Sequence, residues 1–119
     1  MAIALDAKEL GAEWIAAWNA HDLERILAHY AENVVLTSPV AAKVLGDPAG
    51  TVTGIDALRN YFARGLALFP ELRFTLIEAT QGLASVVLYY ENQSGTRTGE
   101  FMEFNAEGKV TRAVAHYSV

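Results

Sequence analysis

Residues 14–23 read Trp-Ile-Ala-Ala-Trp-Asn-Ala-His-Asp-Leu, and residues 104–110, near the other end of the chain, read Phe-Asn-Ala-Glu-Gly-Lys-Val. The first stretch belongs to a helical pattern, in which apolar residues recur at spacings of three and four: Leu10, Trp14, Ile15 and Trp18. Asp6, with Glu9 three residues later, fits a capping box in front of this pattern. The sequence therefore predicts a first helix over about residues 7–20.

Two more helices are predicted downstream. Asp22 can cap a second helix that ends near residues 31–33 and has an amphipathic stripe: Leu23, Ile26, Leu27 and Tyr30. A third helix follows Gly54, with Asp56 as its expected cap, and Pro70 forbids its continuation. Residues 40–53 show no regular pattern and are expected to form a long loop.

The apolar period elsewhere is two, which is typical of strands. We expect strands at five places: residues 34–38, 73–79, 83–92, 98–105 and 109–118. Ser94-Gly95 and residues 106–108 supply turns between the last three strands, which makes them antiparallel hairpins. Helices followed mostly by antiparallel strands indicate an α+β fold, and residues 1–119 are expected to form a single domain.

Composition excludes several classes of function. A chain of 119 residues that is 52% hydrophobic can bury a core without a metal or disulfide. The absence of cysteine excludes disulfides, thiolate zinc sites and a cysteine nucleophile. A net charge of -5, with scattered Lys and Arg, argues against nucleic acid as a partner. No His and carboxylate pair has helical metal-ligand spacing, so neither a metal nor a cofactor is expected.

The expected location is cytoplasmic, with no membrane partner. Residues 1–6 lack the basic start and long apolar run of a secretory signal. No apolar stretch approaches the roughly 18 residues that a membrane-spanning helix requires.

The two quoted stretches resemble signatures of the NTF2-like superfamily, in the branch that includes ketosteroid isomerase and the SnoaL-like polyketide cyclases. In that family an Asn-Ala-x-Asp turn ends the first helix, a strand closes on a Pro, and the last hairpin turns at Asn-x-x-Gly-Lys. All three features are present here, at residues 19–22, Pro39 and residues 105–109. The resemblance spans nearly the whole chain. It implies a cone-shaped, cystatin-like fold with three N-terminal helices packed on a curved, mostly antiparallel sheet that encloses a cavity.

Strand parity predicts which side chains face that cavity. If the turn over residues 93–97 has three residues at its tip, Tyr90 pairs with Glu100, Leu88 with Met102 and Val86 with Phe104. The resemblance makes this shared face concave and adds residues of the last strand: Ala113, Ala115 and Tyr117. The convex face would then carry Val87, Tyr89, Phe101, Val114 and His116. So apolar a face is expected to meet a second copy of the chain, forming a homodimer.

The resemblance also identifies three chemical positions. Ketosteroid isomerases use a Tyr on the first helix, an Asp base before the Pro and a protonated Asp on the penultimate strand. This chain has Trp14, Ser38 and Glu100 at those positions. The indole of Trp14 cannot titrate, and a serine without a partner base is a poor proton acceptor. Glu100 is therefore the candidate catalytic residue, and steroid isomerisation is not expected.

Several candidates have two interpretations. Glu100 is either a buried acid with a raised pKa or a solvated residue near the start of its strand. His116 is either a general base or an interface residue, whereas His21 and His29 are expected to be exposed. Trp14 belongs either to the core or to the cavity wall.

The sequence predicts a protein whose apolar cavity binds a small apolar or partly polar molecule. The expected ligand contacts are Trp14, Ser38, Tyr61, Leu88, Tyr90, Met102, Ala115 and Tyr117. One hypothesis adds cofactor-free acid–base chemistry by Glu100, of an isomerase, cyclase or hydratase type. The other is a non-catalytic ligand-binding or dimerisation module whose own side chains fill the cavity. Fold alone does not choose between them.

Overall fold

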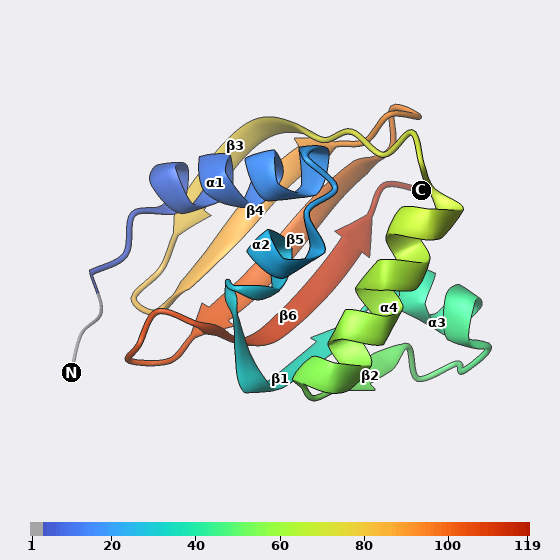
Figure 1. The fold of residues 1–119 in the computed structure, drawn as a ribbon. Coiled ribbons are helices and arrows are strands. Elements are labelled where there is room, and N and C mark those ends of the chain that lie inside the picture. The colour runs from blue at the N-terminus through green and yellow to red at the C-terminus, as the bar shows by residue number, and fades with distance from the viewer. Residues whose placement is uncertain (1–3) are drawn as a thin grey trace.

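The computed structural model describes residues 4–119. The prediction that residues 1–6 form no secretory signal therefore lies partly outside the described residues. Within residues 4–119, four helices pack on one six-stranded sheet (Figure 1), which confirms the α+β class. The elements are α1 (Ala7–Asn19), α2 (Leu23–Leu27), β1 (Tyr30–Thr37), α3 (Pro39–Leu45), β2 (Thr51–Thr53), α4 (Ile55–Leu68), β3 (Thr75–Gln81), β4 (Ser85–Glu91), β5 (Arg97–Phe104) and β6 (Val110–Tyr117).

The strand order in the sheet is β2-β1-β6-β5-β4-β3. The β1–β6 pair is parallel and the other four pairs are antiparallel. The sheet curves around the helices (Figure 1), with α1 packed against β3 and β4, and α4 against β1 and β2. Since α1 and α4 cover opposite ends of the curved sheet, the space between them over β5 and β6 is where a cavity can form.

Helix α1 forms as its sequence predicts. The Asp6 carboxylate accepts hydrogen bonds from the backbone N–H groups of Lys8 and Glu9, both at 3.1 Å, and so caps the first turn. The helix lies close to the sheet at Gly11, where an added Cβ would be 3.0 Å from a methyl carbon of Leu88. A small residue at this position therefore lets α1 cover the inner face of β4.

The second helix is shorter than expected and the following strand is longer. Asp22 caps α2, but the helix ends at Leu27, and β1 already begins at Tyr30. Tyr30 pairs with Val110 of β6, whose N–H donates to the carbonyl of His29. The predicted helix end at residues 31–33 is wrong because this long-range pairing draws the chain into the sheet.

Residues 40–53 contain regular structure, contrary to the predicted loop. The Ser38 hydroxyl caps α3 by accepting from the N–H of Val40 at 3.1 Å, Pro39 opens the helix, and Gly46 ends it with φ 65°. Strand β2 then pairs with β1. The predicted helix after Gly54 is α4, although Gly54 itself, not Asp56, is its N-cap, and α4 ends before Pro70 as expected.

The predicted register of β4 and β5 is wrong by two residues. Tyr90 pairs with Thr98, Leu88 with Glu100 and Val86 with Met102. The reason is a five-residue turn between Glu91 and Arg97, held by the side-chain oxygen of Asn92, which accepts from the N–H groups of Ser94 and Thr96. A shift of two preserves parity, so the predicted inner residues do face inward and are buried: Val86, Leu88, Tyr90, Glu100, Met102, Phe104, Ala113 and Ala115.

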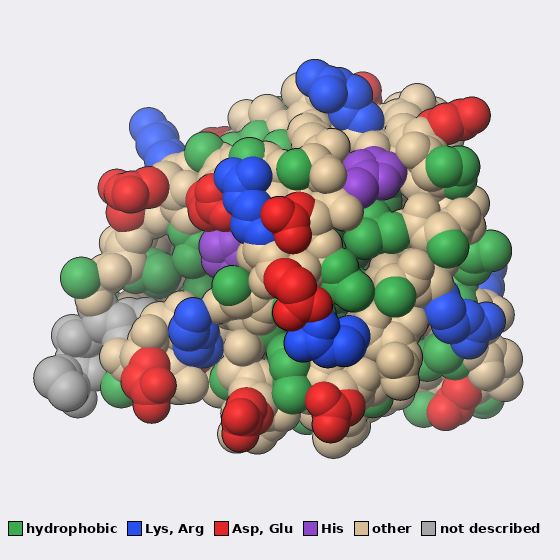
Figure 2. Space-filling view, viewed as in Figure 1, with side chains coloured by type: hydrophobic (Ala, Val, Ile, Leu, Met, Phe, Trp, Pro, Cys, Tyr) green, Lys and Arg blue, Asp and Glu red, His purple; other side chains and the backbone are tan. Residues whose placement is uncertain are grey.

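The convex face also has the predicted composition. Val87 is 39% exposed and Tyr89 36%, with Phe101 and Val114 half-buried beside them. On the helical face, acidic and basic side chains are dispersed among apolar ones (Figure 2). No helix within residues 4–119 is long and apolar enough to cross a lipid bilayer.

Candidate functional site

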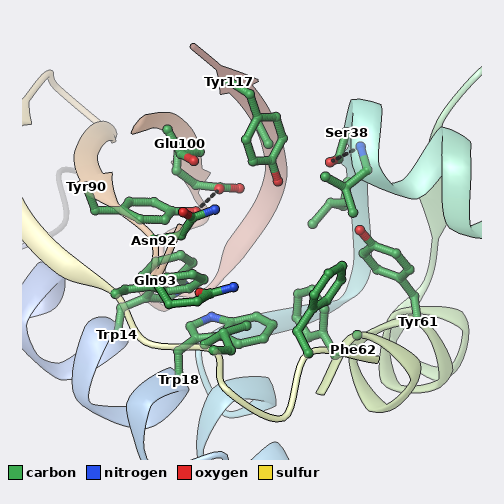
Figure 3. Close-up of a pocket in the computed structure, with 18 of the residues that line it drawn as sticks. Trp14, Trp18, Ser38, Tyr61, Phe62, Tyr90, Asn92, Gln93, Glu100 and Tyr117 are labelled. Atoms are coloured by element: carbon green, nitrogen blue, oxygen red, sulfur yellow. Dashed lines mark hydrogen bonds between the residues drawn. The ribbon is translucent and has the colours of Figure 1, made fainter. Parts of the chain in front are cut away.

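A cavity of about 150 Å³ lies between the helices and the concave face of the sheet (Figure 3). Its floor is aromatic and comes from α1, β1 and α4: Trp14, Trp18, Tyr30 and Phe62. Its mouth includes Phe69, Leu72, Asn92 and Gln93, of which Phe69 and Gln93 are exposed. The cavity is therefore open at one end, and its own lining side chains, Tyr61, Tyr90 and Tyr117 among them, do not fill it.

The aromatic floor is closely packed. The rings of Trp18 and Phe62 meet edge to face with centroids 4.8 Å apart, and those of Trp14 and Tyr90 are 5.3 Å apart. The indole N–H of Trp14 donates to the hydroxyl oxygen of Tyr30 at 3.0 Å, and both groups are buried. Trp14 thus presents its ring to the cavity, while its N–H is already bonded.

Glu100 is the acid of this site. Its side chain extends from the inner face of β5, the residue is 5% exposed, and one carboxyl oxygen accepts a hydrogen bond from the Tyr90 hydroxyl at 2.9 Å. Burial raises the pKa of Glu100 to about 7, against the smaller opposing effect of the Tyr90 hydrogen bond. The buried interpretation of Glu100 is therefore correct. Ala115, its partner on β6, is small and leaves room for the carboxyl group.

Hydroxyl groups form the opposite side of the cavity. Figure 3 shows Ser38 and Tyr61 across the cavity from Glu100, with the Tyr117 phenol projecting between the two walls. They come from the start of α3, from α4 and from the end of β6. Burial raises the pKa values of both phenols. A hydrogen bond with the Ser38 hydroxyl lowers each pKa by a smaller amount. Both phenols therefore stay protonated at neutral pH and can donate hydrogen bonds.

Known proteins resemble this chain in sequence and in fold. The SnoaL-like domain family matches residues 12–119. The chain belongs to this family. A SnoaL-like protein of unknown function from Burkholderia thailandensis is 35% identical, with 95% of this chain and 94% of that chain covered and a TM-score of 0.91. No curated protein matches the chain.

More distant SnoaL-like and cyclase-like structures share the fold. A putative isomerase of the SnoaL-like family from Agrobacterium tumefaciens is 18% identical, with 95% and 97% of the two chains covered and a TM-score of 0.75. The second structure is that of an epoxide hydrolase/cyclase-like enzyme with a role in the formation of a pyran ring of the polyether salinomycin. It is 20% identical, with 95% of this chain and 91% of that chain covered and a TM-score of 0.70. At these identities the likeness establishes the architecture alone.

Two predicted ligand contacts of this SnoaL-like protein lie elsewhere. Leu88 and Met102 are fully buried in the core and do not line the cavity, so their assignment is corrected. Leu88 lies beneath Gly11 of α1, which covers this part of β4. The other six predicted contacts line the cavity together with Glu100: Trp14, Ser38, Tyr61, Tyr90, Ala115 and Tyr117. Their roles in binding remain predictions.

Sequence reasoning missed Trp18, Tyr30 and Thr98 as lining residues. Among the described residues, the Trp18 indole nitrogen and the Thr98 hydroxyl are buried without a hydrogen-bond partner. The parity of β5 could have identified Thr98, since it lies two residues from Glu100 on the same face. Tyr30 could not be identified from a helical pattern, because its position in β1 depends on pairing with β6.

No histidine lines the cavity within the described chain. His21 is half-buried, with φ 54° and a ring nitrogen 2.8 Å from the carbonyl oxygen of Leu72. His29 is half-buried beside Glu13, with 3.5 Å between ring nitrogen and carboxyl oxygen. The predicted exposure of both is therefore wrong. His116 is exposed on the convex face. Residues 4–119 contain no group of three or more His, Asp and Glu side chains that could hold a metal.

Proposed function

We propose that this SnoaL-like protein binds a small, largely apolar carbonyl compound and moves protons on it without a cofactor, with Glu100 as the acid–base group. The observation that supports this is the carboxyl of Glu100, buried at the cavity and hydrogen-bonded to Tyr90. Because its pKa is about 7, both protonation states are populated near neutral pH. One group can then take up a proton and return it.

The size of the cavity limits the ligand. A volume of about 150 Å³ matches an engineered apolar cavity that accepts benzene, so the enclosed part of the ligand is about one ring. The rings of Trp14, Trp18 and Phe62 offer apolar contacts to that part. Any larger portion would leave through the mouth beside Phe69, which is 42% exposed. A four-ring steroid exceeds this enclosed space.

The proposed reaction is proton transfer at a carbon next to a carbonyl group. Removing such a proton yields an enol or enolate, which can be reprotonated at another carbon or can close a ring. Chemistry of this kind is in line with two proteins of similar fold, a putative isomerase of the SnoaL-like family and an epoxide hydrolase/cyclase-like enzyme. The proposal needs one titrating group and hydrogen-bond donors, and Glu100 and the surrounding phenols could supply them.

Deuterium exchange tests the proposal without knowledge of the natural substrate. A panel of single-ring ketones is incubated in D₂O, and NMR follows the loss of protons next to the carbonyl. We expect the protein to accelerate exchange for some members, and Glu100→Gln to reduce the acceleration by about 100-fold or more, the usual contribution of a general base. Ligands that bind without any exchange above the solvent rate would instead support the non-catalytic binding module.

The convex face supports a second proposal, that the protein is a homodimer. Val87 and Tyr89 are partly exposed on this face, next to the half-buried Phe101 and Val114. The guanidinium of Arg112 lies over the Phe101 ring, 6.0 Å from its centre, and covers one face of it in a free monomer. Pairing of two such faces would remove this apolar surface from water.

A further inference from the structure

We infer that the side-chain amides of Asn92 and Gln93 form a binding subsite at the mouth of the cavity, which holds an oxygen atom of a neutral ligand. The inference deepens the proposed function and rests on it, because it takes the cavity as the binding site of a ligand of about one ring. It narrows the ligand class to a ring with a short substituent whose ester or amide carbonyl oxygen reaches the mouth. This oxygen takes no part in the proton transfer proposed at Glu100.

Asn92 opens a turn that the chain builds twice. Between β4 and β5, the side-chain oxygen of Asn92 accepts from the N–H groups of Ser94 at 2.9 Å and Thr96 at 3.0 Å. Between β5 and β6, the oxygen of Asn105 accepts in the same way from the residues two and four positions later, both at 3.0 Å. In both turns a glycine with positive φ follows three residues after the asparagine. The turn alone therefore explains the asparagine oxygen.

The turn does not explain the residue that follows Asn92. Asn92 and Gln93 line the cavity at its mouth, whereas Asn105 does not line it. The residue after Asn105 is Ala106, which has no polar side-chain atom. The same turn thus forms without a second amide. Gln93 adds a polar group at the turn that borders the cavity.

Backbone N–H groups fix the orientation of both amides. The oxygen of Asn92 faces the two N–H groups of its own turn, and the oxygen of Gln93 accepts from the N–H of Arg73 at 3.3 Å. Exchanging the oxygen and the nitrogen of either amide would place an NH₂ group against these same donors.

The amide nitrogens are left for a ligand. Figure 3 shows the nitrogen atoms of Asn92 and Gln93 extending toward the cavity. Among residues 4–119, the hydrogen bonds of these two amides involve only their oxygens. An amide NH₂ group is a donor, so two neighbouring donors face the opening through which a ligand enters. Such a pair fits a hydrogen-bond acceptor on the outer end of the ligand.

The charge around the subsite favours a neutral acceptor. No Lys or Arg is among the described residues that line the cavity, and the one lining carboxyl group belongs to Glu100. A ligand carboxylate would lose hydration at the mouth without gaining a cationic partner, and an ionised Glu100 would repel it. A carbonyl oxygen loses less hydration and gains the same hydrogen bonds. The subsite therefore suits an ester or amide carbonyl.

The test uses neutral methyl esters in which none, one or two CH₂ groups separate the ring from the carbonyl: methyl benzoate, methyl phenylacetate and methyl 3-phenylpropanoate. Each is paired with the alkylbenzene of the same chain length, which has no acceptor: propylbenzene, butylbenzene and pentylbenzene. The parent carboxylates are the anionic probes. Binding in the cavity is followed by the NMR signals of the indole N–H groups, since the chain has only two tryptophans and both line the cavity.

Asn92→Asp and Gln93→Glu remove the NH₂ groups and keep the oxygens that accept from the backbone. We expect each substitution to weaken binding of the tightest ester by about fivefold, the effect of one hydrogen bond. Binding of the matching alkylbenzene should change less than about twofold, because its apolar contacts are unchanged. Asn105→Asp is the matched control. It makes the same chemical change in the same kind of turn away from the cavity, and it should affect neither probe.

Several results would overturn the inference. If the alkylbenzenes bind but no ester loses affinity in Asn92→Asp or Gln93→Glu, the subsite is wrong while the cavity still takes one-ring ligands. Equal losses for ester and alkylbenzene would show that the amides only shape the mouth. Tighter binding of the carboxylates than of their esters would refute the neutral class. If no probe perturbs the indole signals in any variant, the proposed function fails together with the inference.

Discussion

The burial of Glu100 predicts an unusual pH dependence of stability. Its pKa is about 7 in the folded protein, against 4.5 for an ordinary glutamate, because burial disfavours the charged form. The folded state therefore holds this proton more tightly than the unfolded state. The stabilising contribution is fully present below pH 4.5 and is lost as the pH rises through about 7. With about 1.4 kcal/mol for each pH unit between the two values, the full loss amounts to about 3.5 kcal/mol.

Replacement of Glu100 by Gln removes this loss. The amide oxygen can still accept the hydrogen bond of Tyr90, which is donated at 2.9 Å in the native protein. The other titratable groups of the cavity, its four tyrosines, have raised pKa values and do not titrate between pH 5 and 8. The difference in unfolding free energy between the variant and the native protein should therefore grow by about 2.5 kcal/mol over this interval, in favour of the variant, because part of the loss has already occurred by pH 5.

Urea unfolding of both proteins at pH 5, 6, 7 and 8 measures this difference directly. Glu103→Gln is the matched control, because Glu103 lies on the same strand with its side chain exposed. This control should leave the pH dependence unchanged. Parallel stability curves for the native protein and Glu100→Gln would refute the reasoning, since they would mean that the carboxyl ionises as freely in the folded chain as in the unfolded one.

Three further predictions concern other parts of the molecule. Ser38→Ala should lower the unfolding free energy by about 1 kcal/mol through loss of the cap on α3, measured by urea titration; an unchanged value would show that the Val40 contact contributes nothing. Light scattering at micromolar concentration should give twice the chain mass of 12.9 kDa, and Phe101→Glu should give the single mass; a native monomer would contradict the dimer. A 5-ene-3-ketosteroid should not be isomerised above the solvent rate, and turnover that Glu100→Gln abolishes would contradict this.

The fold was predictable wherever short-range signals agree with the long-range contacts. Asp6 and Asp22 cap helices as their positions predict, and Pro70 lies just beyond the end of α4. Helix α3 was missed although Ser38 before a Pro, and Gly46 after the last turn, are recognisable end signals. A helix of seven residues has no amphipathic stripe long enough to be seen.

For the site, strand parity predicts which strand residues face inward, and nothing more. Parity and family resemblance together place Glu100, Tyr90 and Tyr117 on the inner face, even with the register wrong by two residues. They cannot indicate which inner residues are covered by a helix and which face open space. Leu88 and Met102 share the face of Glu100 but lie in the packed core, and at Leu88 the cover is helix α1, which approaches the sheet at Gly11.

Ser38 shows why the residue at a family position does not by itself give the chemistry of a site. Taken alone, a serine in place of a base indicates only that a proton acceptor is missing. In the structure the same hydroxyl caps α3, and its oxygen is thereby committed to the N–H of Val40. The same hydroxyl lines the cavity beside Tyr61 and Tyr117, and its hydrogen bond with each phenol opposes the rise of their pKa values. Ser38 and Tyr61 thus place hydroxyl groups on the wall opposite Glu100, where the resemblance predicted a base. This arrangement becomes visible only when β1, α4 and β6 are placed around the same space, because no local pattern in the sequence relates them.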